Sequence, residues 1–167
     1  MSLSMYQASV PVFVRMLGTL SKLLDRAQAH AEAKKFDPTN FLGMRLAPDM
    51  LPFSKQVQIA CDASKLFCVR VTGLEVPKFD DTEASIAELQ DRIAKTIAVL
   101  NNIPRDAIDG TEAKPITFKA GGQDMTLSAQ DLLLHYTHPN VYFHVTTAYA
   151  ILRQGGVDIG KKDFLGK

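Results

Sequence analysis

The sequence lacks the basic blocks and long apolar runs that indicate binding to nucleic acid or insertion into a membrane. Its net charge is only +1, from 19 basic and 18 acidic residues, and these are spread evenly without a lysine- or arginine-rich block. No apolar run approaches the ~20 residues needed to span a bilayer. The apolar stretch near the N-terminus has no positive charge before it and is interrupted at Arg15, unlike a secretory signal. We therefore expect a cytoplasmic protein that binds neither nucleic acid nor membrane.

Cysteine and catalytic motifs are also scarce. The two cysteines, Cys61 and Cys68, lie seven residues apart in a helical segment. Two helical turns separate them by roughly 10.5 Å, which exceeds the reach of about 7 Å between disulfide-bonded Cα atoms. We interpret both as small core residues. The sequence has no HExxH, no pair of CxxC motifs, no GxSxG and no phosphate-binding glycine loop, so no motif identifies a reaction.

What the sequence does contain is helical periodicity. Its 167 residues are 46% hydrophobic and 22% charged, which is typical of one globular domain over 1–167. Apolar residues in steps of three and four, with capping and stop signals between them, predict four main helices near 9–33, 52–72, 85–102 and 129–154. This pattern favours an all-α fold, a four-helix bundle.

Three irregularities modify this pattern. Because Pro11 lies at the start of the first helix, either the helix begins near Ser9 or an earlier turn from Ser4 is kinked there. Two short alternating runs around Gly121-Gly122 predict a small β-hairpin inserted before the last helix. Pro139 disfavours helical geometry at the residue before it, so we expect a break or kink at His138.

Polar side chains border the core on the last predicted helix. At 100° per residue, Thr137, Asn140 and Thr147 fall within about 60° of His144, and Arg153 falls on the opposite, solvent-facing side. Two interpretations remain open. His144 is either a core histidine bonded to a neighbouring polar group, or the ligand or proton carrier of a shallow pocket.

The stretch PNVYFHVTTAYAILR at 139–153 and the stretch GKKDFLG at 160–166 carry a resemblance. Together with ASVPVF at 8–13 and LAPDM at 46–50, they resemble a domain-of-unknown-function branch of the DinB/YfiT-like superfamily. The resemblance spans nearly the whole chain and implies a four-helix bundle that is often dimeric. Better-known members of that superfamily bind a divalent metal through three histidines, one on the second helix and two on the last, four residues apart. Some of them use the metal in thiol-dependent transferase or isomerase chemistry.

Only one of those three ligands is carried over by the resemblance. His144 matches the second histidine of the last-helix pair, and Asn140 takes the place of the first. The second helix contains no histidine, and its nearest polar stand-ins are Asp49 and Gln56. One imidazole with an amide is a poor site for a divalent metal. We therefore favour no cofactor, with a divalent metal as the alternative.

These observations leave two classes of function, and whether the protein is an enzyme stays open. The favoured hypothesis is a DinB-like helical protein with a degenerate metal site that binds a small ligand or serves as a structural, stress-associated dimer. The alternative is a metal-dependent transferase or isomerase-like enzyme that uses His144. The candidate pocket residues are His144, Asn140, Thr147, Thr137, Asp49 and Gln56.

Wide apolar stripes favour a homodimer. The first helix carries Val12, Met16 and Leu23 outside its main stripe, and the last helix carries Tyr142, Phe143, Tyr149 and Ala150 on its flanks. One apolar face suffices for a helix of a monomeric bundle, so the surplus predicts an exposed patch that a two-fold partner would cover. The alternative is that the connector 35–51, the hairpin and the C-terminal tail cover this surface.

Overall fold

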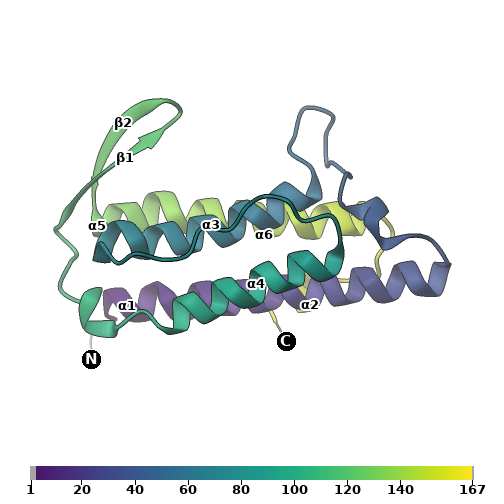
Figure 1. Ribbon diagram of the computed structural model, residues 1–167, viewed down its shortest axis with the longest axis horizontal. Coiled ribbons are helices and arrows are strands. Elements are labelled where there is room, and N and C mark those ends of the chain that lie inside the picture. The colour runs from purple at the N-terminus through teal and green to yellow at the C-terminus, as the bar shows by residue number, and fades with distance from the viewer. Residues whose placement is uncertain (1–2, 167) are drawn as a thin grey trace.

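Four long helices pack around one buried apolar cluster in the computed structural model, which describes residues 3–166 (Figure 1). The long helices are α2 (Val10–Lys34), α3 (Phe53–Thr72), α4 (Ile86–Asn101) and α6 (His138–Gln154). The mostly helical fold predicted from the sequence is confirmed, and α2, α3 and α4 begin and end within one residue of the predicted bounds. Residues 1, 2 and 167 of the predicted domain lie outside the described residues.

The connection between α3 and α4 is long and runs back along the bundle. Helix α3 contacts α4, α6 and α2. Helix α2 also packs on α4 and on α6. In Figure 1, α2 and α6 run in one direction while α3 and α4 both run in the other. The chain between these two parallel helices, residues 73–85, therefore runs back alongside α3 without forming a helix or strand. We call it the crossover segment.

Of the two structures expected around Pro11, the chain has an earlier helical turn that begins after Ser4. A short helix, α1 (Met5–Ala8), is capped by Ser4 and precedes α2. Ser9 lies between the two helices, and its hydroxyl donates to the carbonyl of Met5 at 2.7 Å rather than capping α2. Further short helices are η1 (Pro38–Phe41), η2 (Arg105–Ala107) and α7 (Lys161–Phe164).

The predicted hairpin is confirmed. Strands β1 (Pro115–Ala120) and β2 (Gln123–Ser128) pair antiparallel, with Ala120 opposite Gln123 at the turn. Gly121 and Gly122 have φ values of 58° and 83°, a left-handed pair that favours glycine in two-residue hairpin turns. Phe118 of β1 is buried against Tyr136, with 4.8 Å between ring centroids. The hairpin is thereby fixed to the rest of the fold.

Of the break or kink predicted at His138, the break is wrong. The chain passes continuously from α5 (Ala129–Asp131) through a π-helix, η3 (Leu132–Thr137), into α6, and His138 has helical dihedrals of −58° and −51°. The N–H of His138 donates to the carbonyl of Leu133, five residues back. Pro139 has no N–H to donate, and its ring would collide with the carbonyl four residues earlier. The wider π turn accommodates the proline without ending the helix.

The interpretation of the cysteines is confirmed. Cys61 and Cys68 are both free and buried, and burial raises the pKa of each thiol to about 12. No helix within residues 3–166 combines the length and the apolar character needed to cross a membrane.

Candidate functional site

A buried histidine–glutamine pair joins α6 to α3. His144 is 8% exposed and Gln56 is 1% exposed. The Nδ1 of His144 lies 2.7 Å from the Oε1 of Gln56, and the Nε2 of Gln56 donates to the carbonyl of Leu51 at 2.8 Å. The Leu51 carbonyl fixes the orientation of the amide, so the Gln56 oxygen accepts and His144 Nδ1 donates. The lone pair of the neutral imidazole is therefore on Nε2.

The environment keeps this imidazole uncharged. Burial lowers the pKa of His144 below its ordinary value of 6.5, because removal from water disfavours the charged form. At pH 7 the ring is a neutral acceptor through Nε2. Such a group can accept a hydrogen bond, take up a proton or bind a metal ion.

Two of the predicted site residues do not join this pair. Thr147 is buried, but its hydroxyl donates to the carbonyl of Phe143 within its own helix at 2.7 Å. Asp49 is exposed in the connector before α3 and, within residues 3–166, forms no side-chain hydrogen bond to Gln56 or His144. Of the two polar stand-ins for the missing second-helix histidine, only Gln56 reaches His144.

The other two predicted residues line a small cavity along the same pair of helices. Thr137 and Asn140 face Asp62 and Arg70 of α3 across a recess of about 110 Å³, with Tyr136 beside them. We call this the Arg70 recess. Arg70 lies 14 residues beyond Gln56 on α3, roughly 21 Å along the helix axis. The polar stripe predicted from the sequence is therefore divided: His144 pairs with Gln56, Thr137 and Asn140 line the Arg70 recess, and Thr147 joins neither.

Arg70 is a functional candidate that the sequence pattern did not indicate. Its side chain is half-buried, and the guanidinium carbon lies 4.5 Å from the ring centroid of Phe118, a cation–π contact. Within the described residues no carboxylate lies within ion-pair distance of it. Burial lowers the pKa of Arg70 from its ordinary 12.5, but a guanidinium remains protonated in proteins. The positive charge is therefore held without a negative partner.

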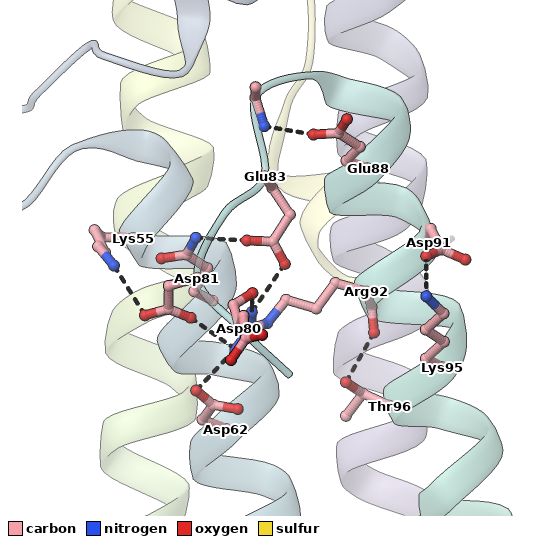
Figure 2. Close-up of polar contacts among 12 residues, drawn as sticks. Lys55, Asp62, Asp80, Asp81, Glu83, Glu88, Asp91, Arg92, Lys95 and Thr96 are labelled. Carbon is pink, nitrogen blue, oxygen red and sulfur yellow. Dashed lines mark hydrogen bonds and ion pairs between the residues drawn. The ribbon is translucent and has the colours of Figure 1, made fainter. Parts of the chain in front are cut away.

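A second polar cluster adjoins the recess at Asp62. Figure 2 shows Arg92 of α4 at its centre, 2% exposed and pointing toward three carboxylates. Its Nη2 lies 2.9 Å from Asp62 and 3.0 Å from Asp81, and its Nη1 lies 2.8 Å from Glu83. We call these four residues the Arg92 cluster. Because Asp81 and Glu83 belong to the crossover segment, the cluster attaches that segment to α3 and α4.

Lysine and glutamine side chains from α3 complete the attachment. Lys55 pairs with Asp81 at 2.8 Å, and Gln58 donates to Glu83 at 2.7 Å. Lys65 donates to the carbonyl of Pro77 at 3.0 Å and lies 3.5 Å from Asp62. The negative charge of Asp62 is thus already compensated by two cations, Lys65 and Arg92.

Metal ligands do not gather in this part of the chain. Across residues 3–166, no three histidine, cysteine, aspartate or glutamate side chains are placed so that they could hold a metal ion together. The Nε2 of His138, at the start of α6, lies 2.8 Å from the carbonyl of Ala8 and does not join His144.

Comparisons with known proteins agree with the resemblance found in the sequence. A family described as a domain of unknown function (DUF1993) matches residues 5–165. A crystal structure of a DinB family member protein from Shewanella denitrificans is 40% identical, with a TM-score of 0.88 over 97% of this chain and 92% of that chain. No curated protein matches. The predicted relation of a domain-of-unknown-function branch to DinB-like proteins is confirmed.

Proposed function

Since the chain belongs to the DUF1993 family and is related to DinB-like proteins, we propose that it is a cytoplasmic four-helix bundle that binds a small molecule. In this proposal residues 1–167 form one domain, and the ligand site lies between α3 and α6. The metal position of the better-known DinB-like proteins is degenerate. The protein then acts through recognition of a ligand rather than through metal chemistry.

The contact between His144 and Gln56 carries this proposal. The Gln56 oxygen accepts the Nδ1 proton at 2.7 Å, so the pair is satisfied internally and leaves only Nε2 available. Asn140, one turn before His144, offers a further amide. One imidazole with two neutral amides does not fit a divalent transition metal, which prefers several imidazole, thiolate or carboxylate donors. Catalysis by a metal at His144 is therefore not the function that this donor set supports best.

The Arg70 recess supplies what a ligand site needs. It is concave, and its apolar walls from α3 enclose a few polar groups, including those of Thr137 and Asn140. Small-molecule sites combine apolar walls with a few placed polar groups, and they often lie between helices of a bundle. The volume of about 110 Å³ accommodates a functional group of a few atoms, with the rest of the ligand lying outside.

A thermal-shift screen tests this proposal. Wild-type protein is compared with Asn140→Leu, which removes the amide and fills the recess, and with the matched control Asn101→Leu at the exposed end of α4. The probes are small polar compounds that include neutral, anionic and cationic members. We expect at least one compound to raise the melting temperature of the wild type and the control but not of Asn140→Leu. A screen without any response, or an undiminished response in Asn140→Leu, would contradict the proposal.

We further propose that the protein is a homodimer formed through α2 and α6. A groove of about 720 Å³ runs between these helices and the C-terminal tail, lined by Val12, Met16, Tyr142 and their mostly apolar neighbours. Tyr142 and Phe143 are 39% and 54% exposed. Leu23, part of the sequence argument, is fully buried and does not belong to this surface. The tail covers part of it, because Phe164 packs on Tyr149 with 5.9 Å between ring centroids.

Sedimentation velocity of Tyr142→Glu tests the dimer. The substitution places a charge on the exposed groove, so we expect a species near the monomer mass of 18.4 kDa, while the wild type sediments at twice that mass. Leu74→Glu, at a comparably exposed leucine of the crossover segment, should leave the dimer intact. A wild-type protein that sediments as a monomer at every concentration would rule the dimer out.

A further inference from the structure

The Arg70 recess contains donors that the protein itself does not use. Within residues 3–166, the side chains of Arg70, Tyr136, Thr137 and Asn140 form no hydrogen bond to another protein group, although all four line the same cavity. None of their polar atoms is among the fully buried ones without a partner, so these atoms are accessible to solvent. Each side chain can donate a hydrogen bond, and Arg70 alone has five N–H groups. The guanidinium of Arg70 has only donors, whereas the two hydroxyls and the amide can also accept. A ligand that binds to all four side chains must therefore present an acceptor to Arg70.

The π-helix explains how these donors reach one cavity. Pro139 produces the wide turn η3, and its last residues, Tyr136 and Thr137, both line the recess. Thr137 is 2% exposed, but its hydroxyl is not among the fully buried atoms without a partner. Single π turns inside α-helices are frequent at functional sites. Here the turn supplies two neighbouring hydroxyl groups opposite the guanidinium.

The charges around the cavity select the sign of the ligand. Arg70 is positive and has no carboxylate partner among the described residues. Asp62, the one acidic residue in the lining, is held by Arg92 at 2.9 Å and by Lys65 at 3.5 Å. A cation would meet the unpaired guanidinium, and a neutral ligand would leave its charge uncompensated.

From these observations we infer that the Arg70 recess binds an oxyanion, the carboxylate or phosphate group of a small organic ligand. Arg70 is the charged donor, and Thr137 and Asn140 donate beside it. Arginine suits this task because its planar fork matches the geometry of both oxyanions. The inference rests on the ligand-binding function proposed above and assigns the chemical class of the ligand, which that proposal leaves open.

Titration followed by ¹H–¹⁵N NMR tests the inference at constant ionic strength. The probes are inorganic phosphate, acetate and the neutral isostere acetamide. We expect saturable shifts at the backbone amides of Arg70, Thr137 and Asn140 with phosphate, acetate or both, and none with acetamide. Arg70→Met should weaken binding at least about tenfold, the loss expected for one charge-assisted hydrogen bond. Arg70→Lys, which keeps the charge, should weaken it less.

Two further variants keep the test decisive. Arg26→Met removes an exposed guanidinium that donates to the carbonyl of Asp158 and should bind the probes as the wild type does. Thr137→Val preserves the shape of a residue in the π turn and should weaken binding even if Arg70→Met does not fold. Unchanged binding in Arg70→Met or Thr137→Val, shifts that map elsewhere, or the absence of saturable shifts would overturn the inference. Binding of acetamide equal to that of acetate would also overturn it, yet would leave the proposed function standing.

Discussion

Arg92→Met is expected to lower the free energy of unfolding by about 3 kcal/mol. Removal of one partner from a buried ion pair typically costs about 3–5 kcal/mol, because a charge is left without compensation. The lower end applies here, since the side chains of Asp62 and Asp81 are 35% and 42% exposed and water can solvate them. Glu83, only 10% exposed, is the carboxylate that would be stranded. For a chain of this length the loss corresponds to roughly 6–12 °C in melting temperature.

Lys95→Met is the matched control for Arg92→Met. Lys95 lies on the same helix and pairs with Asp91, but both side chains are 59% exposed. An exposed pair at i,i+4 contributes only about 0.3–0.5 kcal/mol. Urea denaturation of the three proteins at pH 7 should therefore separate Arg92→Met from the other two. Equal midpoints for the two variants would show that the Arg92 cluster does not stabilise the fold.

The same substitution should alter the acid dependence of stability. Burial raises the pKa of Glu83, but hydrogen bonds from Arg92 and Gln58 outweigh it, and the net pKa lies below the ordinary 4.5. The pKa of Asp81 is likewise held below its ordinary 3.8, because contacts with Lys55 and Arg92 outweigh desolvation. A lowered folded-state pKa contributes stability above the ordinary value that is lost as the pH falls through the folded value. Arg92→Met should lose less stability than the wild type below about pH 4.5.

The double variant Gln56→His/Asn140→His is expected to gain stoichiometric zinc binding. Gln56 already contacts His144 at 2.7 Å, and residue 140 lies one turn before His144 on the same helix. The two substitutions would place three imidazoles around one point, and three protein nitrogens with a water are a common zinc coordination. Burial lowers the pKa of His144, so the ring is already neutral and available at pH 7.

Isothermal titration of protein purified without a histidine tag measures this gain. The wild type should show no saturable zinc binding, and the double variant should bind one zinc per chain. At a free zinc concentration about 100 times the Kd, the double variant should also gain about 2.7 kcal/mol of stability. Gln56→Ala/Asn140→Ala should gain nothing, and a third change, His144→Ala, should abolish the site. Wild-type binding as tight as that of the double variant would show that its amides are adequate ligands.

The helices could be predicted because their signals are local. Periodicity and caps such as Ser85, which accepts from the N–H of Glu88, lie within a few residues of the structure they specify. The same local reasoning failed at Pro139. A rule about the residue before proline does not take account of a π turn, which lets the helix continue through Pro139.

The site could be predicted only in part, since its contacts join distant segments. The helical wheel placed His144, Thr137 and Asn140 beside the core, and the resemblance singled out Gln56, 88 residues from its partner. No pattern indicated Arg92, whose three carboxylate partners lie between nine and 30 residues away. Arg70 was missed for the same reason: a lone arginine near a helix end is usually solvated, and its neighbour Phe118 belongs to the hairpin.

The crossover segment has an electrostatic consequence for the two helices that it connects. Because α3 and α4 start at the same end of the molecule (Figure 1), the positive ends of their macrodipoles lie side by side, where an antiparallel pair would cancel them. The crossover segment brings Asp81 and Glu83 to this end, against Lys55 and Gln58 in the first turns of α3 and just before the Ser85 cap of α4. Each carboxylate near a helix N-terminus contributes about 0.3–1 kcal/mol. The carboxylates of the crossover segment therefore offset the repulsion between the positive ends of two parallel helices.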